Sequence, residues 1–328
     1  MTIELRPPAG ASDMQRIYDL VQAFPAESFH VVDLPYRLCS PSAQVPENAR
    51  LWEDEQGRLL GYAIAQQPFW TLDYCVHPAA RAEGLEERIL AWGLERWPQM
   101  MPRSNGRLSL WLDAREDQAE RIAVLERLGF ARDAWSMRHL SQSLARARSS
   151  ERSEPKARGA APGAVQRPSP QALPPPAVPE GFSIRPLTGE AEVEAHVALH
   201  RAAFESNNMT VDWRRRTLES PQYIPALDLV AVDADGALAG FCVCWLSQRA
   251  NDHNGSVAGQ VEPMGVRPDL QQRGLGRALL LEGLRRLQAH GATTAYVDCD
   301  GENDPAFQLY EAAGFRIAYK VLKYRKDL

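Results

Sequence analysis

The stretch "QQRGLGRALLLEGL", residues 271–284, decides how this chain is interpreted, because glycines stand at the start of a leucine-rich helical pattern. Gly274 and Gly276 are flanked by Arg273 and Arg277. The free backbone N–H groups at the start of a helix attract anions, and glycine lets a phosphate group come close to the backbone. The stretch therefore predicts a loop that binds phosphate groups.

Several folds build such loops, and residue spacing separates them. A P-loop needs the pattern GxxxxGK[ST], and no lysine followed by Ser or Thr stands here. A dinucleotide-binding fingerprint needs a third glycine, where this chain has Leu279. What remains is a loop that follows "VRPDL" (266–270) and consists of Gln271, Gly274 and Gly276.

The composition predicts a soluble globular protein of more than one domain. The chain has 328 residues, of which 45% are hydrophobic and 24% charged. Its net charge of −5 argues against a nucleic-acid partner, and no apolar run is long enough to predict a membrane span. Five cysteines without a CxxC pair, and an N-terminus without the features of a signal peptide, favour a cytoplasmic location.

A proline-rich segment divides the chain into two blocks of similar size. Residues 147–181 contain eight of the 24 prolines, a composition that predicts an extended linker. The flanking blocks, residues 1–146 and 182–328, repeat each other. We call them the first repeat and the second repeat.

The repetition is visible in aligned pairs of segments. "GRLLGYAIA" (57–65) matches "GALAGFCVC" (236–244), "RAEGLEER" (81–88) matches "QQRGLGRA" (271–278), and "VLERLGF" (124–130) matches "LYEAAGF" (309–315). In each repeat a strand, a helix, a glycine-linked hairpin and a fourth strand precede the glycine loop and its helix, and a strand, a helix and a last strand follow. The sequence thus predicts the α+β class, with two tandem domains in which helices flank a mixed, mostly antiparallel sheet.

Two signatures in the second repeat resemble those of a known family. "VRPDLQQRGLG" (266–276) matches V-x-P-x-x-[Q/R]-x-x-G-x-[G/A], with Gln271 at the [Q/R] position. "GENDPAFQLYEAAGF" (301–315) is similar to a second signature, in which an asparagine is followed by a tyrosine and a closing Gly-Phe. The second repeat therefore resembles the GNAT superfamily of N-acetyltransferases over nearly its whole length. The tandem arrangement is similar to that of the mycothiol synthases.

The resemblance implies acetyl-CoA as co-substrate and transfer of its acetyl group to a primary amine, expected to belong to a small molecule, by direct attack in a ternary complex. The residues that it implies for acetyl-CoA binding are Met264, Gly265, Val266, Gln271, Gln272, Arg273, Gly274, Leu275, Gly276, Arg277 and Asn303. The Met264 N–H would polarise the thioester carbonyl, and Asn303 would hold the pantetheine arm. No metal ion is expected, and the sequence leaves the oligomeric state open.

Glu262 and Tyr310 are the candidate catalytic residues. The resemblance implies that Tyr310 protonates the leaving thiolate, and that Glu262, four residues before Val266, removes a proton from the amine directly or through water. Both have simpler interpretations: a tyrosine packed on its helix, and a strand carboxylate that faces solvent or an ion pair. A non-catalytic acyl-CoA sensor or partner-binding module, and a protein or peptide acetyltransferase, are the alternative functions.

The first repeat keeps the apolar pattern but not the chemistry. The alignment puts Glu86 at the position of Gly276, Leu125 at Tyr310, Gln118 at Asn303 and Leu72 at Glu262. A carboxylate at the start of a helix competes with an anionic ligand for the same N–H groups. We therefore expect the first repeat to be a degenerate, non-catalytic domain that packs on the second.

Overall fold

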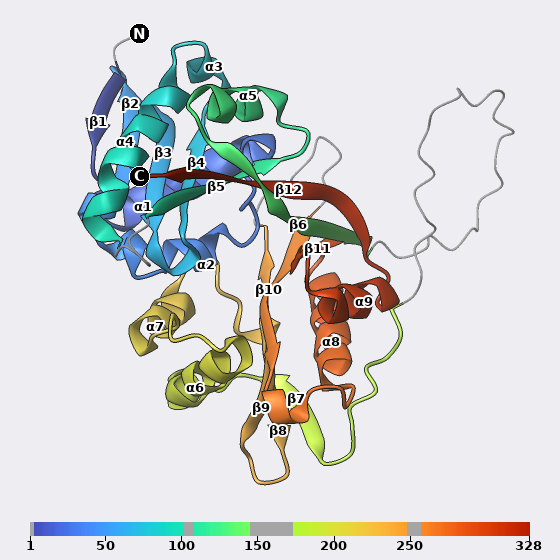
Figure 1. Cartoon of the computed structure of the whole chain (residues 1–328). Helices are drawn as coiled ribbons and strands as arrows, with labels where there is room; N and C mark the ends of the chain where they lie inside the picture. The colour runs from blue at the N-terminus through green and yellow to red at the C-terminus, as the bar shows by residue number, and fades with distance from the viewer. Residues whose placement is uncertain (1–2, 102–107, 145–172, 248–256) are drawn as a thin grey trace, which may run out of the picture.

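A computed structural model describes residues 3–101, 108–144, 173–247 and 257–328. Most of the predicted linker, residues 147–172, lies outside these ranges, and residues 173–181 form no helix or strand. The described part of the chain contains one twelve-stranded sheet, in the order β1-β2-β3-β4-β5-β12-β6-β11-β10-β9-β8-β7 (Figure 1). The strands of the two repeats thus form one continuous layer.

The first repeat contains the helices and strands in the order expected from its sequence. They are β1 (Ile3–Arg6), α1 (Ala11–Ala23), α2 (Leu34–Leu38), β2 (Ala49–Asp54), β3 (Leu59–Gln66), β4 (Thr71–Val76), α3 (Pro78–Arg81), α4 (Leu85–Met100), β5 (Ser109–Arg115), α5 (Ala119–Arg127) and β6 (Ala131–Ser143).

The second repeat follows the same order. Its elements are β7 (Phe182–Pro186), α6 (Val193–Phe204), α7 (Val211–Glu219), β8 (Asp228–Asp233), β9 (Leu238–Leu246), β10 (Ala258–Val266), α8 (Leu275–Ala289), β11 (Thr294–Asp300), α9 (Asp304–Ala312) and β12 (Arg316–Asp327). The predicted class, an α+β fold with helices on a mixed sheet, is confirmed. None of the described helices is long and apolar enough to cross a membrane.

The side chains of β9 alternate between the two faces of the sheet, which explains how helices pack on both faces. Cys242 and Cys244 lie in one apolar cluster with the α8 leucines, whereas Phe241 and Val243 lie in another with α6. Successive side chains of a strand point to opposite faces, so one fully buried strand serves both layers. Figure 1 shows α6 and α7 on one side of β10, and α8 and α9 on the other.

The last strand of each repeat lies in the sheet of the other repeat, which the sequence analysis did not anticipate. β12 pairs antiparallel with β5 over 109–115, and β6 pairs antiparallel with β11 over 294–300. β6 and β12 also pair with each other at the centre of the sheet. Since duplicated last strands have similar patterns, either can fill either place, and the sequence repeat does not distinguish the two arrangements.

Each repeat has one pair of parallel neighbouring strands, and the sheet opens at both pairs. In the second repeat, β10 pairs with β11 only over 258–261 and 294–297. In the first repeat, β4 and β5 share a single ladder position, Thr71 opposite Trp111. We call these openings the second-repeat fork and the first-repeat fork.

Candidate active site

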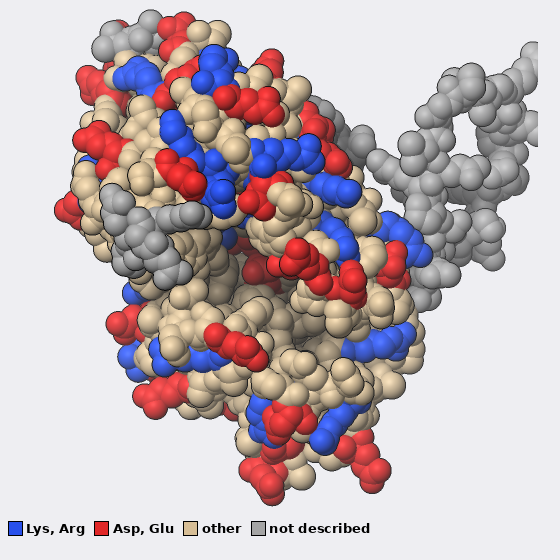
Figure 2. Space-filling view, viewed as in Figure 1, with Lys and Arg blue, Asp and Glu red and all other residues tan. Residues whose placement is uncertain are grey.

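The second-repeat fork opens into a cavity of about 820 Å³, walled by β10, β11, the start of α8, and α9. Figure 2 shows the surface hollowed between the two repeats. Of the thirteen residues singled out from the sequence, all but Arg273 and Leu275 line this cavity. Segments more than 40 residues apart in the chain are therefore gathered around one opening.

The glycine loop leads directly into the first turn of α8. Gly274 precedes the helix with a φ of +85°, a conformation that favours glycine, and Gln272 has a φ of +61°. A Cβ added to Gly276 would lie 3.6 Å from Val266 and 3.7 Å from Leu309, which is ordinary contact. Packing alone therefore does not require glycine at 276, whereas close approach of a phosphate does.

Leu275 and Arg273, which do not line the cavity, differ in their positions. Leu275, the first residue of α8, is buried in the apolar cluster between α8 and the sheet, so only its backbone N–H is available to a ligand. Arg273 is exposed beside the cavity, whereas Arg277 is exposed and lines it. Of the two arginines, Arg277 is the one placed at the cavity wall.

Asn303 and Tyr310 lie at the start and in the last turn of α9. Asn303 caps the helix, because its Oδ1 accepts from the Ala306 N–H at 3.1 Å, which leaves its amide Nδ2 to offer to a ligand. Tyr310 is only 7% exposed, yet lines the cavity. Burial raises the pKa of Tyr310 above its ordinary value, so its hydroxyl stays protonated.

A β-bulge at Glu262 and Pro263 marks the point where β10 leaves β11. Val261 is opposite Cys244 of β9, but Met264 is opposite Cys242, so two residues of β10 face one of β9. The Trp245 indole donates to the Glu262 carbonyl at 2.7 Å and fixes the bulge. Glu262 and Asp298 are the first residues past the paired segment on their strands.

The environment of Glu262 keeps its carboxyl group protonated to unusually high pH. Removal from water is the main cause, and the negative charges of Asp33 and Asp298 add to it, while Arg37 opposes it. Together they raise the pKa of Glu262 to about 8. Asp33 and Arg37 belong to the first repeat, so that repeat tunes a residue of the second.

The site contains residues that the sequence analysis missed. Asp298 accepts from Gln260 Nε2 at 2.8 Å through Oδ2 and lies 2.6 Å from His139 Nδ1 through Oδ1. His139 is on β6, so it reaches the second-repeat fork only through the strand exchange. No sequence signal could have identified His139, because the repeat does not show whether β6 pairs with β5 or with its counterpart β11.

The first-repeat fork is filled by side chains. Glu86 is fully buried, and its Oε1 accepts from Tyr74 Oη at 2.9 Å and from Arg121 Nε at 3.1 Å. The Arg121 guanidinium lies 4.2 Å from the centre of the Tyr74 ring. Only about 20 Å³ is left in the cavity along β4 and β5.

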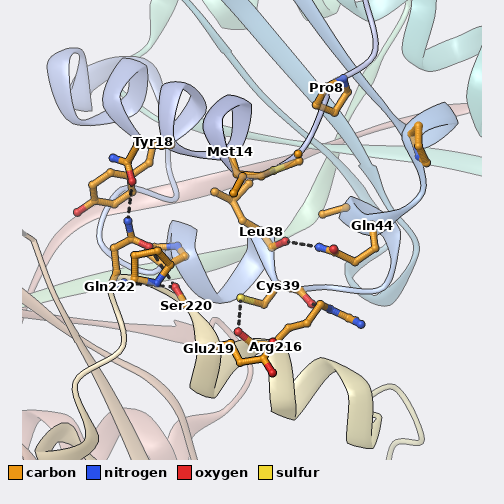
Figure 3. Close-up of a pocket in the computed structure, with 17 residues that line it drawn as sticks. Pro8, Met14, Tyr18, Leu38, Cys39, Gln44, Arg216, Glu219, Ser220 and Gln222 are labelled. Carbon is orange, nitrogen blue, oxygen red and sulfur yellow. Dashed lines mark hydrogen bonds between the residues drawn. The ribbon is translucent and has the colours of Figure 1, made fainter.

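A separate cavity of about 430 Å³ lies between α1 and α2 of the first repeat and the end of α7 in the second (Figure 3). Cys39 and Arg216 tie its walls together, because the Cys39 thiol donates to the Arg216 carbonyl at 3.4 Å and Arg216 Nε donates to the Cys39 carbonyl at 2.9 Å. Neither the glycine loop nor Glu262 lines it. It is therefore not part of the fork.

The fold and the cavity define a class of protein. A solved tandem GNAT protein from the clavulanic acid biosynthesis pathway matches with a TM-score of 0.63 at 18% identity, covering 99% of this chain and 98% of that one. A model of the Acetyltransferase (GNAT) family matches residues 194–315. The expected resemblance is confirmed: the chain is a tandem GNAT protein and an acetyl-CoA-dependent acyltransferase.

Named relatives match most of the sequence of this chain. It is 30% identical over 276 residues to the mycothiol acetyltransferase of Clavibacter michiganensis subsp. michiganensis, covering 82% of this chain and 77% of that protein. It is 29% identical over 266 residues to the mycothiol acetyltransferase of Pseudarthrobacter chlorophenolicus, covering 78% and 71%. The chain therefore belongs to the GNAT acetyltransferase family.

Proposed function

We propose that the protein transfers the acetyl group of acetyl-CoA to a primary amine of a small molecule, by direct attack in a ternary complex at the second-repeat fork. The observation that carries the proposal is the gathering of Glu262, Met264, Tyr310 and the start of α8 around one cavity. Relatives of the chain are named for mycothiol, which favours an acceptor that is a small molecule.

The start of α8 is the proposed site for the pyrophosphate. Its first N–H groups have no partner within the helix, and Gly274 and Gly276 add no side chain over them. Arg277 adds a positive charge at the wall, and Asn303 offers its amide to the pantetheine arm. The backbone N–H of Met264, next to the bulge, is the proposed donor to the thioester carbonyl oxygen.

Glu262 and Tyr310 are proposed to move protons on opposite sides of the thioester. Tyr310, protonated because it is buried, donates to the leaving thiolate sulfur. Glu262, with a pKa raised to about 8, accepts a proton from the attacking amine once it is ionised. No described group of His, Cys, Asp and Glu could hold a metal ion, and the proposal uses none.

We further propose that the first repeat (1–146) does no chemistry of its own, that 147–181 is a linker, and that catalysis belongs to 182–328. The buried Glu86 carboxylate supports this division, because it lies where the glycine loop of the second repeat leaves room for a phosphate. The first repeat still contributes to the site through β6, Asp33 and Arg37.

Release of free CoA thiol tests the proposal. Purified full-length protein is incubated with acetyl-CoA and a panel of primary amines that includes mycothiol stripped of its acetyl group, amino sugars and amino acids. We expect turnover with at least one amine. Tyr310→Phe and Glu262→Gln should each lower kcat by about 100-fold while the affinity for acetyl-CoA by calorimetry is kept.

Glu302→Gln is the matched control, because Glu302 is exposed and does not line the cavity. A protein that binds acetyl-CoA but acetylates no amine, with both site variants indistinguishable from the wild type, would be a sensor or binding module instead. Acetylated lysines or N-termini after incubation with a proteome would favour a protein acceptor.

A further inference from the structure

The proposed reaction releases one proton per turnover, and Glu262 can accept it only when its own carboxyl group is ionised. The acceptor begins as an ammonium group and loses one proton before its nitrogen attacks the thioester carbon. The reaction then forms one C–N bond and breaks one C–S bond, the second proton of the nitrogen ends on the thiol, and one proton is released per turnover. With a pKa of about 8, roughly nine in ten Glu262 side chains are still protonated at pH 7. A protonated carboxyl group cannot accept that proton until it has lost its own.

Past the fork, Asp298 faces Glu262 across the opening and is held in a fixed orientation. Both of its oxygens are engaged, Oδ2 by Gln260 Nε2 at 2.8 Å and Oδ1 by His139 Nδ1 at 2.6 Å. An oriented carboxylate that faces Nδ1 favours the tautomer with the hydrogen on Nδ1. The lone pair of His139 is then on Nε2.

The His139 ring is locked between aromatic side chains. It stacks on Tyr319 with ring centres 4.4 Å apart and on Tyr296 at 5.0 Å, and it meets the Phe29 ring in a T-shaped contact with ring centres 5.9 Å apart. The ring also lines a cavity of about 140 Å³, which Gln260 lines beside it. His139 is therefore positioned by packing on three sides and open to a small cavity next to β10.

We propose that Asp298 and His139 form the second proton acceptor of this site: His139 Nε2 takes up the proton released in each acetyl transfer and passes it to solvent. Asp298 holds the ring and stabilises the imidazolium that forms. The inference rests on the proposed function and adds to it a residue from the first repeat. Strand exchange then has a chemical consequence, because it delivers His139 to the other repeat's fork.

Other charged groups near the ring do not offer an equivalent route. The ionisable groups that face it are Asp298 and Tyr296 of β11, Tyr319 of β12, Arg115 of β5, and His30 next to Phe29. Arg115 binds Asp117 and lies over the Tyr319 ring at 4.1 Å. His30 Nδ1 lies 2.7 Å from Asp33 Oδ2. Burial raises the pKa of Tyr319, so its hydroxyl stays neutral.

The rate of acetyl transfer as a function of pH tests the inference, with the best amine of the panel as acceptor. His139→Asn should lower kcat by about 100-fold at pH 7, where most Glu262 side chains are protonated and the released proton needs another acceptor. Above pH 9 the Glu262 carboxyl group is ionised and can accept the proton itself, so the variant should approach the wild-type rate. A role in packing alone would give a loss that does not depend on pH.

Asp298→Asn should show the same pH-dependent loss of kcat at a smaller size, about tenfold. The variant removes the carboxylate that orients the His139 ring but keeps the ring nitrogen that accepts the proton. His290→Asn is the matched control, since His290 is exposed just after α8, where its Nδ1 lies 2.8 Å from the Arg286 carbonyl oxygen. Calorimetry with acetyl-CoA confirms that each variant is folded and binds. Wild-type turnover by His139→Asn at pH 7 would overturn the inference and leave the proposed function intact.

Side-chain nitrogen NMR of the full chain decides the inference even if no amine is acetylated, which would itself refute the proposed function. The His139 signal, assigned by its loss in His139→Asn, should show a hydrogen on Nδ1 and a lone pair on Nε2 at pH 8. A hydrogen on Nε2 in the wild type would overturn the inference, because that nitrogen could not accept a proton.

Discussion

The two forks began as the same structure and now differ in what occupies them. In the second repeat, the opening between β10 and β11 leaves a cavity of about 820 Å³ in front of the glycine loop. In the first repeat, Glu86 stands at the position of Gly276 and is buried against Arg121 and Tyr74. An internal carboxylate paired with an arginine thus occupies, in the first fork, the place that the glycine loop of the second fork leaves open.

A ligand site and a structural core can thus share one backbone. A glycine at the helix start leaves N–H groups exposed to a cavity, whereas a glutamate with a buried arginine partner closes it. The cost of burying the carboxylate is offset by its ion pair and by the Tyr74 hydrogen bond. Exchanging these features between the forks therefore tests directly whether they decide what each fork holds.

The largest effect is expected from Gly276→Glu, which copies the first repeat into the second. The carboxylate would face the pyrophosphate at the start of α8, and we expect the affinity for acetyl-CoA to fall by at least about 100-fold, measured by calorimetry. Gly276→Gln has a similar size without the charge and separates repulsion from obstruction. Unchanged affinity in Gly276→Glu would show that the glycine loop does not hold the phosphates.

The converse change, Glu86→Ala, should destabilise the protein and create no second site. It leaves the Arg121 guanidinium buried without its carboxylate, for which we expect a loss of about 3 kcal/mol in the free energy of unfolding. Urea denaturation measures it. Glu87→Ala is the control, because Glu87 forms an ion pair with Arg127 whose side chain is 59% exposed, and should cost less than about 1 kcal/mol.

Most of the fold followed from the sequence, because its signals are local. Apolar periodicity predicted the order of elements, and Gly274 and Gly276 predicted the start of α8. The resemblance pointed to Glu262, four residues before Val266, and the Asn303-to-Tyr310 spacing put both of those residues at one helix. Each of these depends on residues within a few positions of one another.

What the sequence did not reveal depends on contacts between distant segments. The charge of Glu86 was visible, but its partner Arg121 lies 35 residues away and was not identified. The exchange of β6 and β12 was not predicted, since repeats of equal pattern allow both pairings. His139 therefore had no visible partner in the sequence, although Asp298 lies beside it in the fold.

An intermediate effect is expected where an exchanged strand meets the second repeat. A Cβ added to Gly301, at the end of β11, would lie 2.4 Å from the Ser136 carbonyl oxygen of β6. Gly301→Ala should push the two strands apart and cost about 2 kcal/mol in thermal or urea unfolding. Gly276→Ala is the control, since its Cβ meets only side chains at ordinary distance. Wild-type stability of Gly301→Ala would mean that β6 does not lie against β11.

The smallest effect concerns Glu262, whose counterpart in the first repeat is Leu72. The pKa of the Glu262 carboxyl is about 8 in the folded protein against an ordinary 4.5, so the folded state binds more protons than the unfolded state between these values. The stability that this proton uptake provides is therefore lost as pH rises through the window, and is gone above about pH 8. A glutamine cannot ionise, so the Glu262→Gln variant does not lose this stability. Between pH 5 and pH 9 its free energy of unfolding should therefore rise by about 1 kcal/mol relative to that of the wild type, a small value because the Glu262 side chain is only half-buried.

Urea unfolding at both pH values measures this difference, with Glu302→Gln as the control for loss of an exposed charge. If Glu262→Gln gained nothing at pH 9, the carboxyl would be ionised at neutral pH, and Glu262 would need no second acceptor to act as a base.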